Sequence, residues 1–139
     1  MKNKKVILGL VVSIILVLVI GLGVWFLFFN KKEKINVYLF WGDGCPHCEN
    51  AKQFFSSIKE EYSEYYNLVE YEVWYNDDNS SLLDTVKNEF NLERVGVPFI
   101  VIGDEYFKGY SSRSDEKIKS TIVSQYENDD YVDIVEKVK

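Results

Sequence analysis

Cysteine, proline and histidine are scarce in this chain of 139 residues, which has two cysteines, two prolines and one histidine. A closed zinc site takes four ligands, so zinc would need carboxylates or a second molecule here, and a metal carrier is only a distant alternative. Both cysteines belong to the run Cys45-Pro46-His47-Cys48. Covalent haem attachment requires histidine directly after the second cysteine of such a pair, and Glu49 stands there. We therefore predict neither a metal nor haem.

The chain also lacks a basic stripe. It contains 22 acidic and 16 basic residues, for a formal net charge of −6. All of the acidic residues, and all but three of the basic ones, lie after residue 30. Because nucleic-acid-binding domains concentrate Lys and Arg on one face, this balance excludes nucleic acid as an expected partner.

One long segment has no charge at all. Val6–Phe29 consists almost entirely of Val, Ile, Leu, Phe and Gly. As a helix rising about 1.5 Å per residue it would reach ~36 Å, enough to cross a hydrocarbon core of ~30 Å. A cleaved secretory signal is the alternative, but the run is longer than usual and no small-x-small cleavage pattern follows it. We predict a head at residues 1–5, a membrane anchor at Val6–Phe29 and a linker at residues 30–34.

The orientation of this anchor depends on weaker signals. Lysines flank both ends of the apolar run in equal number, so the positive-inside rule does not decide the orientation. The short head and the lone CxxC pair favour a single-pass protein of the cell membrane whose domain, residues 35–139, is extracytoplasmic. An inward-facing domain would favour a reductase.

Residues 35–139 alternate between strand and helix patterns. Ile35–Trp41 is apolar at nearly every position, as in a strand covered on both faces, whereas Leu68–Tyr75 carries Glu70 and Glu72, which suit an edge strand. The order β-α-β-α-β-β-α predicts an α/β sandwich with a parallel first pair and a hairpin later. The remaining expected elements are a helix from Pro46, a helix capped within Asn76–Asn79, strands at Pro98–Gly103 and Tyr106–Tyr110, a helix capped by Ser112 or Ser114, and a last turn or two within Asp130–Val138.

The CxxC pair falls between the first strand and the helix that follows it. A helix N-terminus offers unpaired N–H groups and a positive dipole end, both of which favour a thiolate. Pro46 suits the first turn, where its missing N–H costs nothing. We expect Cys45 to be exposed and to react, Cys48 to resolve the mixed disulfide, and His47 to lie beside the Cys45 sulfur and favour its thiolate.

Two motifs carry a resemblance to a known family. The run Phe40–Cys48, together with Val95-Gly96-Val97-Pro98-Phe99, resembles the thioredoxin superfamily. The resemblance covers most of residues 35–126 and implies a minimal thioredoxin-like fold. It further implies that Pro98 is cis and faces the CxxC pair, and that the backbone of Val97 binds an extended substrate. Pro46-His47 resembles the DsbA type of active site, which implies an oxidising redox disulfide between Cys45 and Cys48.

The chain departs from the superfamily at several positions. The buried carboxylate that the superfamily places six residues before the first cysteine falls on Leu39, and the usual tryptophan before that cysteine is Gly44. The interval between Cys48 and Pro98 is too short for the helical insertion of DsbA-type oxidases. Trp41 and Asp43 are possible site residues, although a packed strand aromatic and a turn-forming aspartate are simpler interpretations.

The sequence therefore predicts a membrane-tethered thiol–disulfide oxidoreductase that exchanges disulfides with cysteine-containing secreted or membrane proteins. A redox partner would recycle the pair, and no cofactor beyond the Cys45–Cys48 disulfide is required. Two alternatives remain at this stage: a reductase on the same scaffold, and a non-catalytic thioredoxin-like binding module.

Overall fold

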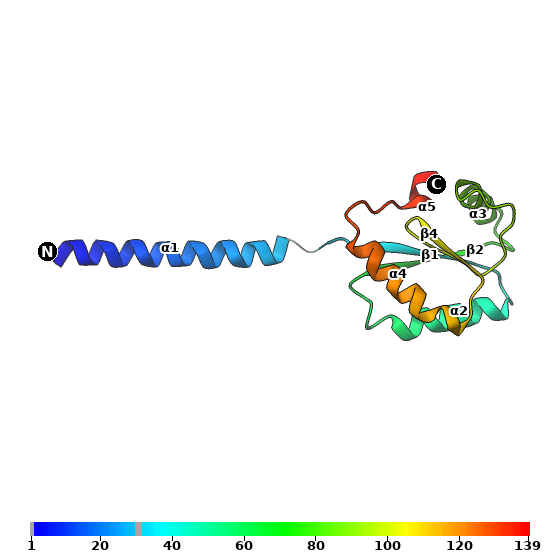
Figure 1. Cartoon of the computed structure of the whole chain (residues 1–139), viewed down its shortest axis with the longest axis horizontal. Helices are drawn as coiled ribbons and strands as arrows, with labels where there is room; N and C mark the ends of the chain where they lie inside the picture. Colours follow the sequence, from blue (N-terminus) through cyan, green and yellow to red (C-terminus); the bar gives the residue numbers. More distant parts are fainter. Residues whose placement is uncertain (1, 30–31) are drawn as a thin grey trace. The chain divides into compact units, whose positions relative to one another are not determined.

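A computed structural model describes residues 2–29 and 32–139 and divides the chain into two units, residues 1–32 and 33–139. The first unit contains the helix α1, Lys2–Phe29 (Figure 1). Its segment Ile7–Trp25 has a mean hydropathy of 3.1, and none of it is buried. By length and composition α1 could therefore span a membrane. Residues 2–5 of the predicted head belong to this helix. Of the predicted linker, residues 30 and 31 lie outside the described residues, and Lys32–Lys34 have no regular secondary structure.

The second unit is built on a four-stranded sheet with the order β2-β1-β3-β4. β1 pairs in parallel with β2 and antiparallel with β3, and β3 and β4 form an antiparallel hairpin. The predicted parallel first pair and later hairpin are thus confirmed, and Glu70 and Glu72 lie on an edge strand. The strands are β1 (Ile35–Trp41), β2 (Tyr66–Glu72), β3 (Phe99–Ile102) and β4 (Glu105–Lys108).

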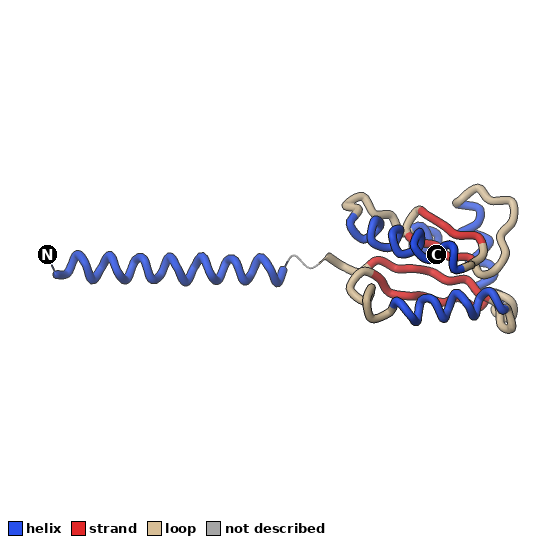
Figure 2. Tube along the Cα trace, turned by 60° about the horizontal axis from the view of Figure 1, so that its bottom comes forward, coloured by secondary structure: helices blue, strands red, loops and turns tan. Residues whose placement is uncertain are grey.

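Helices cover both faces of this sheet, as Figure 2 shows. α2 (Pro46–Ile58) and α4 (Asp115–Glu127) pack on one face. α3 (Asp77–Glu89) and α5 (Ile134–Val138) pack on the other. Because side chains alternate along a strand, successive residues of β1 enter different core clusters: Val37 and Leu39 face α2 and α4, whereas Tyr38 and Phe40 face α3 and α5. The predicted α/β sandwich, a minimal thioredoxin-like fold, is confirmed.

The end of β2 differs from the prediction of a strand over Leu68–Tyr75. The strand begins at Tyr66 and ends at Glu72, and the side chain of Tyr75 is 80% exposed. The cause is local: the Glu72 carboxylate accepts the backbone N–H groups of Trp74 and Tyr75, each at 2.9 Å. These bonds turn the chain before Tyr75 can pair as part of the strand. The prediction that Tyr75 belongs to this strand was therefore wrong.

Helix caps agree with the sequence in one case and differ in another. Asn76 caps α3 as predicted, its Oδ1 accepting the N–H of Asn79 at 3.0 Å. Ser114 precedes α4, but neither it nor Ser112 forms a side-chain cap, because Ser112–Ser114 form a short 3₁₀ turn that leads into the helix. Asp115 and Glu116 in the first turn of α4 supply the negative charge that a helix N-terminus favours.

Candidate active site

A tight turn joins β1 to α2. The N–H of Cys45 donates to the carbonyl of Gly42 at 3.1 Å, and Gly44, the third residue of the turn, has φ +80°. Glycine adopts that angle without steric cost. A Cβ on Gly42 would collide with the indole of Trp74. Both glycines are therefore required by the backbone that delivers Cys45 to the start of α2.

Cys45 and Cys48 form a disulfide across the first turn of α2, with their Cα atoms 5.3 Å apart. Cys45 is the N-cap, and the N–H of Cys48 points at its Sγ at 3.2 Å. Once the disulfide is reduced, this donor and the helix dipole would favour a thiolate at Cys45. The predicted helix-start placement of the pair is therefore present.

The two cysteine residues differ in exposure, but less than the sequence suggested. Cys45 is 6% exposed and Cys48 is 0% exposed, so the prediction of an exposed Cys45 was wrong in degree. The reason is that the Cys45 Sγ faces the helix terminus on one side and lies 3.9 Å from the carbonyl oxygen of Val97 on the other. Of the two cysteines only Cys45 presents any surface, so an attacking thiol can reach only that residue.

The bend at Val97–Pro98 lies beside this sulfur, although it is some fifty residues away in the sequence. The Val97–Pro98 peptide bond is cis, and Pro98 is buried. The Pro98 carbonyl accepts the N–H of Gly109 at 2.8 Å, and Gly109 has φ +75°. Within the described residues the N–H of Val97 has no hydrogen-bond acceptor. This part of the backbone can therefore pair with another chain.

His47 and Pro46 are exposed on the first turn of α2. Among the described residues His47 forms no hydrogen bond with either cysteine. It instead borders two shallow hollows of about 300 and 580 Å³, both of which also reach Tyr110 and Ser111. The Tyr110 hydroxyl donates to Asp115 Oδ1 at 2.7 Å. Burial, together with this bond to a carboxylate, raises the pKa of Tyr110 above its ordinary value.

The contacts of Trp41 and Asp43 are those of residues that support the fold. Trp41 is partly buried against the core, and the Lys52 Nζ lies 2.9 Å from its ring centroid and 3.6 Å from Glu70 Oε1. Asp43 is an exposed turn residue whose backbone N–H donates to Glu72 Oε1 at 3.3 Å. These contacts favour the packed aromatic and the turn-forming aspartate over direct site roles.

Sequence reasoning missed the role of Glu72 beside this turn. Its carboxylate accepts N–H groups from Trp74, Tyr75 and Asp43, and so ties the end of β2 to the loop before Cys45. Burial raises the pKa of Glu72, but these backbone bonds outweigh burial and hold its pKa below the ordinary value. The sequence offered only a carboxylate on an edge strand. No pattern in it indicated a tie to the Asp43 backbone.

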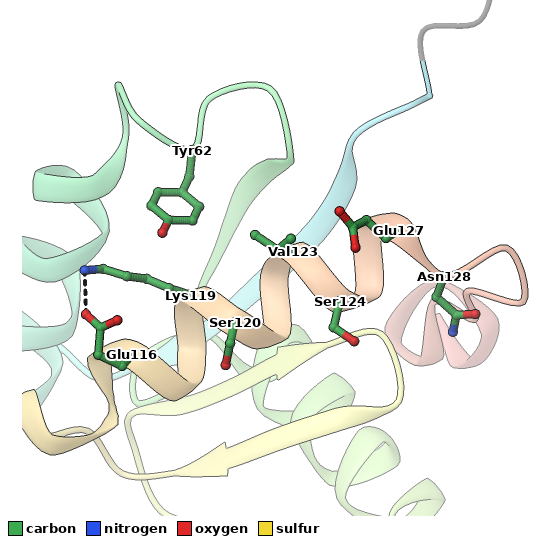
Figure 3. Close-up of a pocket in the computed structure, with 8 residues that line it drawn as sticks. All are labelled: Tyr62, Glu116, Lys119, Ser120, Val123, Ser124, Glu127 and Asn128. Atoms are coloured by element: carbon green, nitrogen blue, oxygen red, sulfur yellow. Dashed lines mark hydrogen bonds and ion pairs between the residues drawn. The ribbon is translucent and has the colours of Figure 1, made fainter.

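Another hollow lies away from the disulfide. It has a volume of about 700 Å³ and lies along α4, opposite Tyr62 (Figure 3). Its rim includes the ion pair between Lys119 Nζ and Glu116 Oε1 at 3.0 Å. None of the predicted site residues lines this hollow. It is therefore separate from the disulfide.

Solved structures with a similar fold include the following two bacterial proteins. A protein described as thiol:disulfide interchange protein DsbE, from Chlorobium tepidum, matches with a TM-score of 0.50 and 11% identity over 68% of this chain and 82% of that chain. A protein from Agrobacterium tumefaciens matches with a TM-score of 0.52 and 17% identity, over 67% of this chain and 48% of that chain. At such identities the likeness concerns the fold. No curated protein matches the chain.

A family model gives the more specific match. The glutaredoxin model covers residues 37–107, just over half of the chain. That span contains both cysteines and the Val97–Pro98 bend, the groups that the fold brings together around the Cys45 sulfur. The chain therefore belongs to the glutaredoxin family and has a thioredoxin-like fold with a CxxC disulfide.

Proposed function

We propose that this protein is a membrane-tethered thiol–disulfide oxidoreductase that exchanges disulfides with protein cysteines through Cys45. The observation that carries the proposal is the Cys45–Cys48 disulfide at the N-terminus of α2, with the Cys45 Sγ 3.9 Å from the Val97 carbonyl. Cys45 is also the only one of the two cysteines with exposed surface. The similar structure from Chlorobium tepidum is described as a thiol:disulfide interchange protein, which supports the same reaction class.

The exchange takes place in two displacements. A client thiolate attacks the Cys45 Sγ, the Cys45–Cys48 bond breaks, and its electron pair goes to the Cys48 sulfur, which takes a proton. A second client thiolate then attacks the client sulfur of the mixed disulfide and releases Cys45 as a thiolate. The client loses two electrons and the pair gains them. A partner disulfide must then oxidise the pair again, and no metal or organic cofactor takes part.

The backbone near Pro98 would hold the client during these steps. An extended client segment can pair with the free N–H and the carbonyl of Val97, as in strand addition at a sheet edge. Such pairing would place the client cysteine beside the Cys45 sulfur. Because it uses main-chain groups, it would accept clients of varied sequence.

The redox chemistry favours a compartment outside the cytoplasm. Disulfides persist in oxidising environments outside the cytoplasm. With α1 as its anchor, the domain would act on secreted or membrane proteins close to the membrane that they have crossed. The same domain on the cytoplasmic side would instead work as a reductase.

A trapping experiment tests the proposed reaction. In Cys48→Ala the Cys45 thiolate can still attack a client disulfide, releasing one client sulfur as a thiolate, but no Cys48 sulfur can then displace the client. The full chain in detergent should therefore accumulate mixed disulfides between Cys45 and cysteine-containing proteins of the membrane fraction. Cys45→Ala is the matched control and should trap nothing. Mass spectrometry of the linked products identifies both partners. Equal trapping by the two variants, or no trapping by Cys48→Ala even with an unfolded client carrying a disulfide, would reject the proposal in favour of a non-catalytic module.

A further inference from the structure

Two neighbouring aromatic side chains, just after the end of β2, stand in solvent. Trp74 is 53% exposed and Tyr75 is 80% exposed. Among the described residues of the domain, the other large hydrophobic side chains with substantial exposure are Tyr106 at 37% and Val132 at 46%. Tryptophan and tyrosine are enriched where proteins contact partners. An exposed pair of them is therefore a candidate contact surface.

This aromatic pair is held in place. Glu72 accepts the N–H groups of both residues at 2.9 Å, and the Asn79 side-chain amide donates to the Glu72 carbonyl at 2.9 Å. These bonds fix the backbone of residues 72–75, called the corner below, between the end of β2 and the first turn of α3. A contact surface that is already ordered loses less conformational entropy when it binds.

The corner is also continuous with the proposed active site. The indole of Trp74 lies against Gly42, so closely that a Cβ there would collide with it. Gly42 in turn accepts the N–H of Cys45 at 3.1 Å. One glycine therefore separates the indole from the reacting cysteine. A client segment bound at Cys45 therefore has this ring within a short reach along the loop.

The unpaired charged side chains close to this corner, along the chain or through Glu72, are acidic. Asp43, Asp77 and Asp78 are exposed, and none of their carboxylates forms an ion pair within residues 2–29 and 32–139. The nearby Lys52 already lies over Trp41 and faces Glu70. An aromatic face beside unpaired carboxylates attracts a cation, because the ring quadrupole and the negative charges act in the same direction.

We infer that Trp74 is a specificity-determining residue that receives a Lys or Arg side chain next to the client's reacting cysteine. This inference rests on the proposed function and adds the client chemistry: a protein segment in which the cysteine is flanked by basic residues. Tyr75 and the carboxylates of Asp43, Asp77 and Asp78 complete the surface.

Matched peptides test this inference on the full chain in detergent. Three peptides carry one reduced cysteine flanked by lysines, serines or glutamates, and dithiothreitol serves as a small neutral thiol. The quantity measured is the second-order rate constant for reduction of the Cys45–Cys48 disulfide. Each peptide is compared between wild type and variant, which cancels differences in the peptides' own thiol pKa. The variants are Trp74→Ala, Trp74→Phe and Tyr75→Ala, with Val132→Ala as the exposed apolar control.

The expected result is selective. Trp74→Ala should slow the lysine peptide by roughly two- to fivefold, the size of an exposed cation–π contact. Trp74→Phe should recover part of that rate, and Val132→Ala should leave it unchanged. The rates with the glutamate peptide and dithiothreitol should stay within about twofold of wild type. Added salt should reduce the preference for the lysine peptide, since exposed charges are screened.

Other outcomes have distinct meanings. If Trp74→Ala slows every thiol equally, the indole only supports Gly42 and the inference fails. If the serine peptide is affected as much as the lysine peptide, the surface is apolar and the inference fails again. Should Trp74→Ala not fold, Tyr75→Ala, at a more exposed position of the same surface, provides the test. Selective slowing of the lysine peptide supports the inference, and equal rates for all peptides reject it. A wild-type protein that reacts with no thiol rejects the proposed function, whereas one that reacts without charge preference rejects only this inference.

Discussion

Glu72 links the end of β2 to the loop that carries Cys45, through N–H groups of Trp74, Tyr75 and Asp43. These bonds favour the carboxylate over the protonated acid, so the pKa of Glu72 in the folded protein lies below the ordinary value of 4.5. A group with a depressed folded pKa stabilises the protein above its unfolded pKa, and this contribution is lost as pH falls through the folded pKa. Glu72 should therefore support stability at neutral pH and progressively less below about pH 4.5.

Glu72→Gln provides the test. We expect it to lower the urea midpoint of unfolding at pH 7. We expect the gap from wild type to narrow as pH falls below about 4.5, because the stabilising ionised carboxylate is then progressively lost. Glu70→Gln lies on the same edge strand, and among the described residues the Glu70 carboxylate pairs with Lys52 and accepts no backbone N–H, so this variant should show a smaller gap at pH 7. A gap for Glu72→Gln that stays constant over this range would show that the ionised carboxylate has no special role.

Individual residues also show what a sequence cannot specify. Cys45 and Cys48 could be identified from spacing, and Pro98 from a motif fifty residues away. The burial of Cys45 could not, because it depends on a carbonyl from Val97 that reaches the sulfur only in the folded chain. The tie between Glu72 and Asp43 is long-range in the same way. Patterns report local geometry, and these features arise from tertiary contacts.

At the scale of elements, the predicted limits of a strand or helix match the observed ones where the local sequence pattern is strong. β1 has the predicted limits, because a run that is apolar at nearly every position ends at a glycine turn. β2 was placed two residues late and ran three too far, since its alternation continues into Tyr75 while the Glu72 carboxylate turns the backbone. α4 has a 3₁₀ turn in place of a serine cap. Where side chains compete for backbone groups, periodicity alone misplaces an element's end.

The N-terminus of α2 sets the expected redox potential. The Cys48 N–H and the helix dipole both stabilise a Cys45 thiolate, which should lower its pKa below about 8.5 and stabilise the reduced pair. We therefore expect a potential more positive than the roughly −270 mV of thioredoxin, where each ~30 mV is a tenfold change in equilibrium constant. Equilibration of the full chain with glutathione buffers, with mass spectrometry of the alkylated products, measures it.

His47→Ala separates the helix from the histidine. Since His47 forms no hydrogen bond with either cysteine among the described residues, this variant should change the potential by less than about 30 mV, one tenfold step. A larger change would assign the oxidising character to His47. A wild-type potential at the thioredoxin value would instead favour the reductase alternative.

At the scale of the whole molecule, the chain combines a glutaredoxin-family domain with a helix that could span a membrane. The sequence alone indicated both parts, because a long uncharged run and a pair of family motifs are each strong signals. The sequence does not indicate the orientation of the helix in the membrane in the same way. The lysines on the two sides of the apolar run Val6–Phe29 balance, so no local pattern decides which compartment holds the domain. Topology therefore has to be measured.

We predict that α1 holds the protein in the membrane with the domain outside the cytoplasm. In a Cys45→Ala, Cys48→Ala background, Tyr75→Cys places a thiol at an 80% exposed position of the domain. A membrane-impermeant maleimide should label it in intact cells. Asn3→Cys, an exposed position at the other end of α1, is the matched control and should react only after permeabilisation. The opposite labelling pattern would place the domain inside, where reduction is the expected direction, and loss of the protein from carbonate-washed membranes would rule out α1 as an anchor.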